Sequence, residues 1–456
     1  MKILLINPPI REWARPNVLP LGLGYLAAVA RNAGHEVDVM DINAFRWDRQ
    51  TVQEKIRAAE FDAVGIGAIV TVYKYVKWLV EFIKSTAPDK KIMVGGSVGT
   101  SIPHIILDRT PADIVCIGEG EETFPELLSA LEEGRDLGTV AGIWFKDADG
   151  NIRKNPARPP IRNLDEIPFP AWDLFPMDIY LKNPVGAPNR NKWSDGRGED
   201  ACAFSMNISA TRGCPYQCIY CYHDFMGHGY RHRSPENVVD EIKCLRDRYG
   251  VPYVHFIDDE FCLNKKFVAD FCALMTRTFH GTVTWGCTGR VNLMSEPLVA
   301  AMAEAGCVLL CYGIESGSQR MLDVMKKGVR VQEAKAAVRL TQKHMGWADC
   351  SFMIGLPGEN HQTIRETVDF CKELRLAPEV VFFATPYPGT ELYRLALAQG
   401  KIRDEEEYVL NLGEQGEHIR VNFSELSDAQ LYAAQEKMIA ELGAWNKTKH
   451  YEQVTS

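Results

Sequence analysis

The sequence predicts an α/β protein: a doubly wound, Rossmann-like amino-terminal domain, then a partial (β/α)6 barrel and a small helical carboxyl-terminal segment. Strand-like and helix-like segments alternate through most of the chain, which is typical of parallel sheets with helical crossovers. At 456 residues, the chain also exceeds what one hydrophobic core usually supports. A proline-rich and glycine-rich stretch separates the two alternating regions, so we expect domains at 1–140 and 201–395, a linker at 141–200 and a helical segment at 396–456.

The first domain begins with the buried run KILLIN, followed by a helix that ends at Gly34. Three more strands are expected at 35–41, 62–69 and 91–97, and a strand with its helix within 112–134. The helices between them are expected at 51–60, 72–88 and near 102–110. Right-handed crossovers between such strands give a parallel sheet covered on both faces.

Ligands of such sheets bind beyond the carboxyl ends of the strands. At these strand ends the sequence has turns rich in glycine, which would allow the backbone to lie close to a large flat ligand. The alternative is that these glycines only form the tight turns of the sheet. The candidate contacts are Pro20, Leu21, Gly22, Thr71, Gly95, Gly96, Gly118, Glu119 and Gly120. No G-x-G-x-x-G follows the first strand, which argues against a nicotinamide site.

Two segments interrupt or follow the alternation. Within the linker, GIWFKDADGNIRKNPARPP predicts a hairpin that turns at Asp149-Gly150. The last sixty residues are mostly helical and charged, with Ser427-Asp428 as a helix cap. We interpret them as packing helices in preference to a cover over the substrate.

The second domain repeats a strand and helix pattern that yields six strands. They are expected at 203–213, 253–261, 282–291, 307–317, 348–359 and 379–390. Six units fall short of the eight that close a barrel, so the sheet should stay open.

Three cysteines follow the first strand of this domain, in RGCPYQCIYC. Cys214, Cys218 and Cys221 lie at the strand end where barrels place their active sites. Structural zinc takes four ligands, and His223 nearby keeps zinc as an alternative. Three thiolates in one loop suit a 4Fe-4S cluster better, because each binds one iron and the fourth iron stays open.

The C-x3-C-x2-C motif, with Tyr220 before its last cysteine, resembles that of radical S-adenosylmethionine (radical SAM) enzymes. The resemblance implies that the open iron chelates S-adenosylmethionine and that an electron from the cluster cleaves its sulfonium. A 5′-deoxyadenosyl radical then takes hydrogen from a small-molecule substrate. It also implies a low-potential reductant of the flavodoxin or ferredoxin type.

Further positions match this family. FIDDEF ends the second strand, so Asp258, Asp259 and Glu260 are candidates to bind the methionine ammonium, although the familiar Gly-Gly-Glu is absent. Arg290 would meet the methionine carboxylate, Glu315 and Ser316 the ribose and adenine, and the backbone near Ile354 and Leu356 the adenine. Solvated helix caps and a simple ion pair with Arg290 are the alternatives.

PLGLGYLAA, VGGSVGT and CIGEGEETFPELL are similar to the cobalamin-binding domain that precedes one subgroup of this family. No Asp-x-His-x-x-Gly is present, so cobalamin should bind base-off without a histidine ligand. Its lower face is then left to water or to no ligand, with Trp13 or Arg11 as candidates to screen it. The subgroup implies methyl transfer from S-adenosylmethionine through methylcobalamin to an unactivated carbon or phosphorus. Cyclisation, ring contraction or rearrangement without methyl transfer is the alternative. A cobalamin sensor or iron-sulfur electron carrier without catalysis, and a radical enzyme that has lost cobalamin, are further alternatives.

Charge and composition exclude other classes. The net charge of −9 and the absence of a basic stripe argue against nucleic-acid binding. The apolar start stops at Asn7-Pro8-Pro9, too soon for a signal peptide or a membrane span, and predicts a cytoplasmic protein. An odd count of 13 cysteines, clustered between 202 and 371 except for Cys116, indicates metal chemistry or buried thiols in a reducing compartment.

Overall fold

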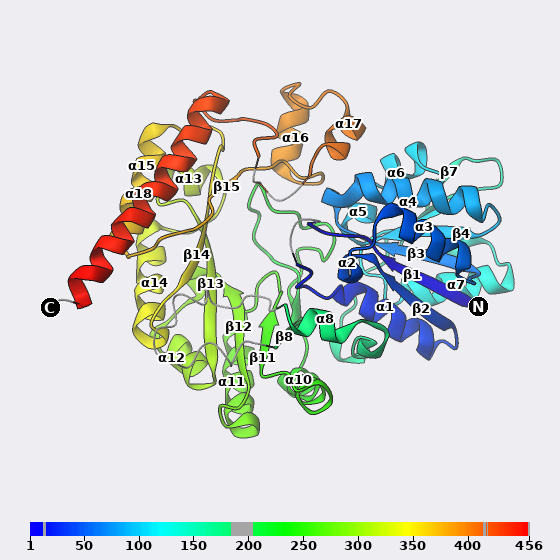
Figure 1. Ribbon diagram of the computed structural model, residues 1–456, viewed down its shortest axis with the longest axis horizontal. Helices are drawn as coiled ribbons and strands as arrows, with labels where there is room; N and C mark the ends of the chain where they lie inside the picture. The colour runs from blue at the N-terminus through cyan, green and yellow to red at the C-terminus, as the bar shows by residue number, and fades with distance from the viewer. Residues whose placement is uncertain (12–14, 184–203, 414–415, 417, 455–456) are drawn as a thin grey trace.

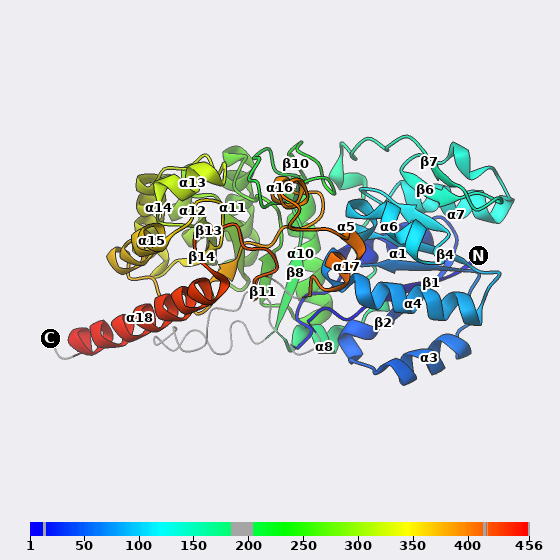
Figure 2. The same cartoon turned by 90° about the horizontal axis from the view of Figure 1, so that it is seen from above.

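The computed structural model describes residues 1–11, 15–183, 204–413, 416 and 418–454. Two sheets, each flanked by helices, lie side by side (Figure 1), with the amino terminus at the outer edge of one domain and the carboxyl terminus at the outer edge of the other. Figure 2 shows the same arrangement from above, with α16 and α17 at the junction in both views.

The first sheet has seven strands in the order β2-β1-β3-β4-β5-β6-β7. The pairs from β2 to β5 are parallel, which is the doubly wound order with its switch point beside β1. The strands are β1 Lys2–Asn7, β2 Glu36–Asp41, β3 Ala63–Gly67, β4 Lys91–Gly95, β5 Ile114–Cys116, β6 Ile143–Lys146 and β7 Ile152–Lys154.

Helices cover both faces of this sheet because alternate side chains of its strands point to opposite sides. In β1, Leu5 belongs to the cluster on the α1 and α7 side, and Leu4 to the cluster on the α3, α4 and α6 side. The helices are α1 Leu21–Asn32, α2 Ile42–Phe45, α3 Arg49–Ala58, α4 Tyr73–Thr86, α5 Gly96–Ser101, α6 Pro103–Arg109 and α7 Thr123–Glu133.

The hairpin expected in the linker is present and turns at Gly150, whose φ is +81°. Its first strand, β6, pairs antiparallel with β5, so the hairpin extends the first sheet. After it come the single-turn helices η3 Leu164–Glu166 and η4 Trp172–Leu174 and the short helix α8 Met177–Leu181. The cluster that packs on α1 and α7 continues through Trp172 and Tyr180 into the second domain, so the two domains share a core. Residues 184–200 lie outside the described part.

The second sheet has six parallel strands in the order β15-β14-β13-β12-β11-β8. They are β8 Ser205–Ile208, β11 Tyr253–Phe256, β12 Thr284–Gly289, β13 Cys307–Glu315, β14 Asp349–Ile354 and β15 Phe382–Phe383. The helices are α10 Pro235–Tyr249, α11 Lys265–Phe279, α12 Glu296–Glu304, α13 Gln319–Val324, α14 Val331–Met345 and α15 His361–Glu373. The curled sheet stays open, as predicted for a partial barrel (Figure 1).

The last segment contacts both domains. It contains α16 Glu391–Ala398, α17 Glu405–Leu410 and α18 Asp428–Val454. In α17, Glu406 accepts hydrogen bonds from Tyr73 Oη at 3.1 Å and Lys77 Nζ at 2.7 Å in the first domain. In α18, Glu441 pairs with Arg365 of α15 at 2.8 Å, which docks this helix on the barrel. None of the helices in the described ranges combines the length and apolar composition needed to cross a bilayer.

Candidate active site between the two sheets

The three cysteines lie in a loop bracketed by two short paired strands, β9 Thr211–Arg212 and β10 Arg231–His232. The loop follows β8 and is held at its centre by Ile219, which donates its N–H to Met325 O at 3.0 Å and accepts from Leu392 N at 2.8 Å. Its entry needs glycine, because Gly213 has φ +80° and a Cβ there would lie 2.4 Å from the carbonyl oxygen of Gly229.

Cys218 lies near two cationic side chains. A hydrogen bond from the Cys221 thiol lowers the pKa of Cys218, and the charges of Lys327 and Arg290 act in the same direction. A thiolate is the form that binds metals. Within the described residues no three metal-ligating side chains converge on one ion, as zinc would require. Ligands of a cubane cluster need not converge, because each thiolate takes its own iron, so this loop fits the cluster better than zinc.

The three carboxylates after β11 hold different positions. Asp258 braces the turn that leads into the cysteine loop: its Oδ1 accepts from Ser209 Oγ at 2.8 Å, and from Ala210 N and Thr211 N at 2.9 and 3.0 Å. Burial nevertheless raises its pKa to about 7. Asp259 accepts from Gly213 N at 3.2 Å, so it too supports the loop.

Glu260 lies near two cationic side chains. Burial raises its pKa to about 7, while Arg290 and Lys327 act to lower it. One of its oxygens, Oε1, accepts from Cys262 N at 3.1 Å. Asp258 keeps a second oxygen, Oδ2, that is buried without a hydrogen-bond partner in the described residues, and Glu260 lies near Arg290. Which of the three carboxylates meets a ligand ammonium therefore stays a prediction.

Arg290 is buried beside the cysteines and has spare donors. Its guanidinium lies 3.6 Å from the centroid of the Tyr216 ring, and its Nη1 lies 3.9 Å from Cys218 Sγ. Its Nε and Nη2 are buried without a hydrogen-bond partner in the described residues. A carboxylate ligand would satisfy both, which fits the carboxylate of S-adenosylmethionine. Tyr216, which stacks on Arg290, was not among the sequence predictions.

Glu315 and Tyr220 share a lysine that sequence analysis missed. Lys327 Nζ lies 2.9 Å from Tyr220 Oη and 3.2 Å from Glu315 Oε1, and Lys327 and Glu315 are both buried. Glu315 has φ +66°, an unusual conformation for a residue other than glycine, which indicates a position fixed by its surroundings.

The remaining predicted contacts of the second domain are engaged in the protein itself. Ser316 Oγ lies 3.0 Å from Thr367 Oγ1 and accepts from Ser318 N at 3.1 Å. The side chains of Ile354 and Leu356 are fully buried in the core. A contact between these residues and adenine therefore has to come from the backbone, and it stays a prediction.

The carboxyl edge of the first sheet carries the other candidates. Gly96 has φ +80°, and a Cβ there would lie 2.6 Å from the carbonyl oxygen of Ala68, so this turn accepts only glycine. Gly95 precedes it at the end of β4, and Thr71 lies in the turn η1 Val70–Val72 after β3. Gly118 and Gly120 follow β5, and a Cβ on Gly118 would lie 3.8 Å from the carbonyl oxygen of Phe225, which follows the cysteines.

The start of α1 ties this edge to the barrel. Leu19 donates to and accepts from the side chain of Asn207, in β8, at 2.8 and 2.9 Å. Pro20 and Leu21 therefore sit against the first barrel strand, and Gly22 is exposed with open space around it. The carboxyl edges of the two sheets thus face each other. Arg11 lies in the loop after β1, and Trp13 lies outside the described residues.

The carboxylate of Glu119 is engaged within the protein, and the predicted contact of this residue with a cofactor stays a prediction. Its carboxylate is buried between the domains, where it accepts from Arg212 Nη1 at 2.8 Å and Arg231 Nη1 at 2.8 and 2.9 Å. Ile161 N adds a bond at 2.8 Å. Arg212 also pairs with Glu121 at 2.5 Å. Both arginines belong to the strands that bracket the cysteine loop, so the first domain fixes the position of that loop.

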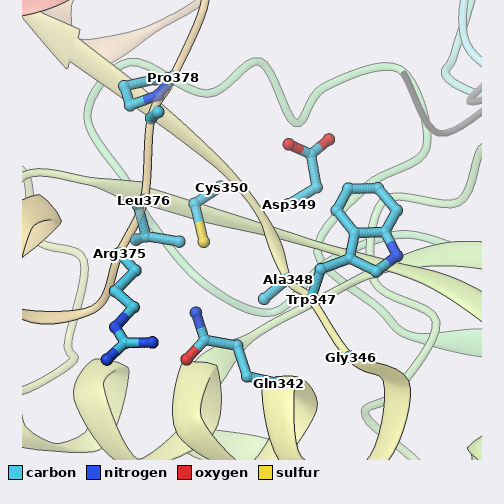
Figure 3. A pocket seen from close by; sticks show the side chains of 10 residues that line it. Gln342, Gly346, Trp347, Ala348, Asp349, Cys350, Arg375, Leu376 and Pro378 are labelled. Carbon is cyan, nitrogen blue, oxygen red and sulfur yellow. The ribbon is translucent and has the colours of Figure 1, made fainter. Parts of the chain in front are cut away.

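A cavity of about 300 Å³ lies elsewhere in the second domain. Figure 3 shows its lining, which comes from the end of α14, the start of β14 and the turn after α15, with Trp347, Asp349 and Arg375 around it. These are the amino ends of the strands. The cavity is therefore on the edge of the sheet opposite the cysteine loop.

Comparisons with known proteins agree with this arrangement. A model of the radical SAM superfamily matches residues 208–371, and a model of the B12 binding domain matches residues 13–128. An uncharacterized methyltransferase of Pyrococcus horikoshii is 34% identical over 404 residues, 87% of this chain and 83% of the relative. An anaerobic magnesium-protoporphyrin IX monomethyl ester cyclase of Rubrivivax gelatinosus is 29% identical over 426 residues, 90% of this chain and 72% of the relative.

Among solved structures, the radical S-adenosylmethionine methyltransferase TsrM of Kitasatospora setae superimposes with a TM-score of 0.72. The match covers 88% of this chain and 76% of TsrM at 21% identity, so it establishes a shared fold.

Proposed function

Because the chain belongs to the radical SAM superfamily and carries a B12-binding domain ahead of its radical SAM domain, we propose that it transfers methyl groups from S-adenosylmethionine to an unactivated carbon or phosphorus of a small molecule. When bound, the cluster supplies the electron that cleaves S-adenosylmethionine, and cobalamin supplies a carrier for the methyl group. The observation that carries the proposal is that the carboxyl edges of the two sheets face each other, with Gly118 next to the loop that holds the cysteines.

The residues of the second domain divide the work of binding. Cys214, Cys218 and Cys221 would hold the cluster, and Arg290, with two unpartnered donors, would bind the carboxylate of S-adenosylmethionine. Glu260, which lies near Arg290, or Asp258, whose Oδ2 is buried without a partner in the described residues, would accept from its ammonium. An anion on Arg290 would also lower the electrostatic cost of burying that charge.

The first domain would hold cobalamin along its carboxyl edge. Gly95, Gly96 and Gly118 keep that edge free of side chains, and no histidine lies in the described part of the loop after β1. This supports the expectation that cobalamin binds base-off without a protein ligand from that loop. The glycines would allow the flat corrin ring to approach the backbone closely.

A rearrangement or cyclisation without methyl transfer is the second candidate. It is favoured by the similarity to the Rubrivivax cyclase, which extends over 90% of this chain. Both candidates use the same cofactors, so the fold does not separate them.

The two candidates differ in how they consume S-adenosylmethionine, and this can be measured without the substrate. The reconstituted protein is incubated anaerobically with a chemical reductant and S-adenosylmethionine, and two products are quantified. Methyl removal leaves S-adenosylhomocysteine, whereas reductive cleavage leaves 5′-deoxyadenosine. A methyltransferase forms both; formation of 5′-deoxyadenosine alone would favour the cyclase-like reaction. Neither product should form in the Cys218→Ala protein beyond the non-enzymatic background.

We also propose that the electron comes from a reductant of the flavodoxin or ferredoxin type, and that the protein acts in the cytoplasm. The cysteines in the described residues are all free thiols, which suits a reducing compartment. Flavodoxin that has been reduced beforehand should transfer an electron to the oxidised cluster, and bleaching of the cluster absorbance on mixing tests the first point.

A further inference from the structure

A buried ion pair lies against the cysteine loop, and none of the binding roles given above involves its lysine. Lys327 Nζ donates to Glu315 Oε1 at 3.2 Å and to Tyr220 Oη at 2.9 Å. The side chains of Lys327 and Glu315 are each 10% exposed, and Tyr220 directly precedes Cys221. Charges in such an interior position act on their surroundings more strongly than surface charges do, because water and salt screen them less.

The turn that carries the lysine is fixed to the cysteine loop. Met325, two residues before the lysine, accepts through its carbonyl oxygen from Ile219 N at 3.0 Å, and both side chains belong to one apolar cluster. Gly328, the next residue, faces Arg290, because a Cβ there would lie 3.7 Å from Arg290 Nη2. Arg290 Nη1 in turn lies 3.9 Å from Cys218 Sγ. The turn after α13 is therefore packed between the cysteine loop and the arginine beside Cys218.

The strand that carries the glutamate makes room for the pair. Glu315 ends β13 with φ +66°. Two residues earlier, a Cβ on Gly313 would lie 2.5 Å from Glu315 Oε1 and 3.2 Å from Lys327 Nζ. A larger residue than glycine at 313 would thus displace both charged groups. The pair is held by the backbone on one side and by Tyr220 on the other.

The two charges act on the cysteines in opposite directions. A hydrogen bond with Cys218 and burial raise the pKa of Cys221; the charge of Lys327 opposes this rise, and the charge of Glu315 adds to it. Ionisation of a thiol and reduction of a bound cluster each add one negative charge at this loop. A nearby cation therefore favours both changes, and a nearby carboxylate opposes both.

We propose that Lys327 and Glu315 together set the reduction potential of the iron-sulfur cluster, the lysine by stabilising the electron that the cluster accepts and the glutamate by opposing it. Reduction transfers one electron from the low-potential reductant to the cluster, and no bond forms or breaks at the pair. Net charge and solvent exposure around a cluster are known to shift its potential. This inference rests on the cluster of the proposed function, and it does not depend on methyl transfer.

A redox titration of the full-length protein tests the proposal. The chain is reconstituted with the cluster alone, so that no corrinoid signal overlaps, and the reduced cluster is followed by electron paramagnetic resonance without S-adenosylmethionine. Glu315→Gln removes the negative charge and keeps an acceptor for the lysine. At a given solution potential it should raise the ratio of reduced to oxidised cluster about tenfold, which corresponds to about 59 mV for one electron.

The contribution of the lysine is measured in the Glu315→Gln background, because Lys327→Met alone would leave a buried carboxylate without its partner. The double variant Glu315→Gln/Lys327→Met should lower the ratio again by about tenfold, to near the wild-type value. The neighbouring pair of Lys326 and Glu391, at 2.7 Å and with side chains 56% and 46% exposed, supplies matched controls. Lys326→Met and Glu391→Gln should each change the ratio less than about twofold, since water screens these charges.

The proposal is overturned if Glu315→Gln and the double variant both titrate within about twofold of wild type, or if the added Lys327→Met exchange fails to lower the ratio. Partial loss of cluster in a variant does not obscure the result, because a midpoint potential depends on the ratio of the two forms and not on their amount. A purely structural role would change cluster content or melting temperature without these opposite shifts. Formation of 5′-deoxyadenosine and S-adenosylhomocysteine by wild type is a separate readout, and its failure would refute the proposed function while leaving the two shifts in place.

Discussion

Replacing Glu119 should loosen the junction between the domains. Glu119 accepts from Arg212, which is buried, from Arg231, whose side chain is 13% exposed, and from Ile161 N. In Glu119→Ala, Arg212 keeps Glu121 at 2.5 Å, but Arg231 keeps only backbone carbonyls, those of Ile161, Met226 and Gly229 at 2.7, 2.9 and 3.5 Å. One largely buried charge is thus left without a hydrogen-bonded carboxylate. Such a change usually costs about 3–5 kcal/mol when the charge is fully buried, and the partners that both arginines retain place the expected loss at about 3 kcal/mol.

Urea unfolding of the full-length protein, followed by circular dichroism, measures this loss as a shift of the midpoint to lower urea. Glu119→Gln keeps an acceptor but not the charge, so it should lose about half as much. Glu122→Gln is the matched control on the same loop. Glu122 is 55% exposed, and its ion pair with Arg158, at 3.8 Å, should contribute at most about 1 kcal/mol to the free energy of unfolding. If the free energy of unfolding of Glu119→Ala lies within about 0.5 kcal/mol of that of the control, the ion pairs of Glu119 do not join the domains as the structure indicates.

Three further changes test other parts of the account. Burial raises the pKa of Glu359 from 4.5 to about 7, so the folded state binds one proton more than the unfolded state between these values, and the free energy of unfolding should fall as pH rises from about 4.5 to 7. In thermal unfolding, Glu359→Gln should not show this decline and should be about 3 kcal/mol more stable than wild type above pH 7. Parallel pH profiles of the stability of the two proteins would contradict this. Gly96→Ala should strongly destabilise the protein, because alanine is strained at φ +80°. Gly22→Ala lies in an exposed helical turn and should raise the free energy of unfolding by up to about 1 kcal/mol. Equal effects of the two changes on the melting temperature would refute the argument that backbone strain requires glycine at Gly96. Arg290→Lys should weaken the binding of S-adenosylmethionine to the reconstituted protein about 10-fold or more, as measured by equilibrium dialysis. Lysine lacks both the paired N–H donors of a guanidinium and its stacking on Tyr216. Unchanged affinity would show that Arg290 is not part of the binding site.

Local patterns were enough to predict most of the regular elements. The strand KILLIN is β1, and the amphipathic segment at 265–279 is α11, which Asn264 caps by accepting from Phe267 N. The helix α5 was not predicted, because GSVGTS has no apolar periodicity and its start depends on the conformation of Gly96. The hairpin 143–154 was predicted, but its place in the first sheet was not, since nothing local indicates that β6 pairs with β5.

The cysteine motif could be found from sequence because its ligands are adjacent in the chain. The charged partners that position it could not, because they come from distant segments. Arg212 and Glu119 are 93 residues apart, and Tyr220 and Lys327 are 107 residues apart. Likewise, the sequence placed three carboxylates after β11 but did not show that Asp258 is committed to backbone donors of the cysteine loop.

The central claim is that the two facing sheet edges hold the cluster and cobalamin on either side of one shared space. Electron paramagnetic resonance of the reduced, reconstituted protein tests this claim most directly. With the cluster in its one-electron reduced form and cobalamin as Co(II), the account predicts that the two paramagnetic centres broaden or split each other's signals, and that Cys218→Ala restores an isolated Co(II) signal. Two independent signals in the wild-type protein, at full occupancy of both cofactors, would contradict it.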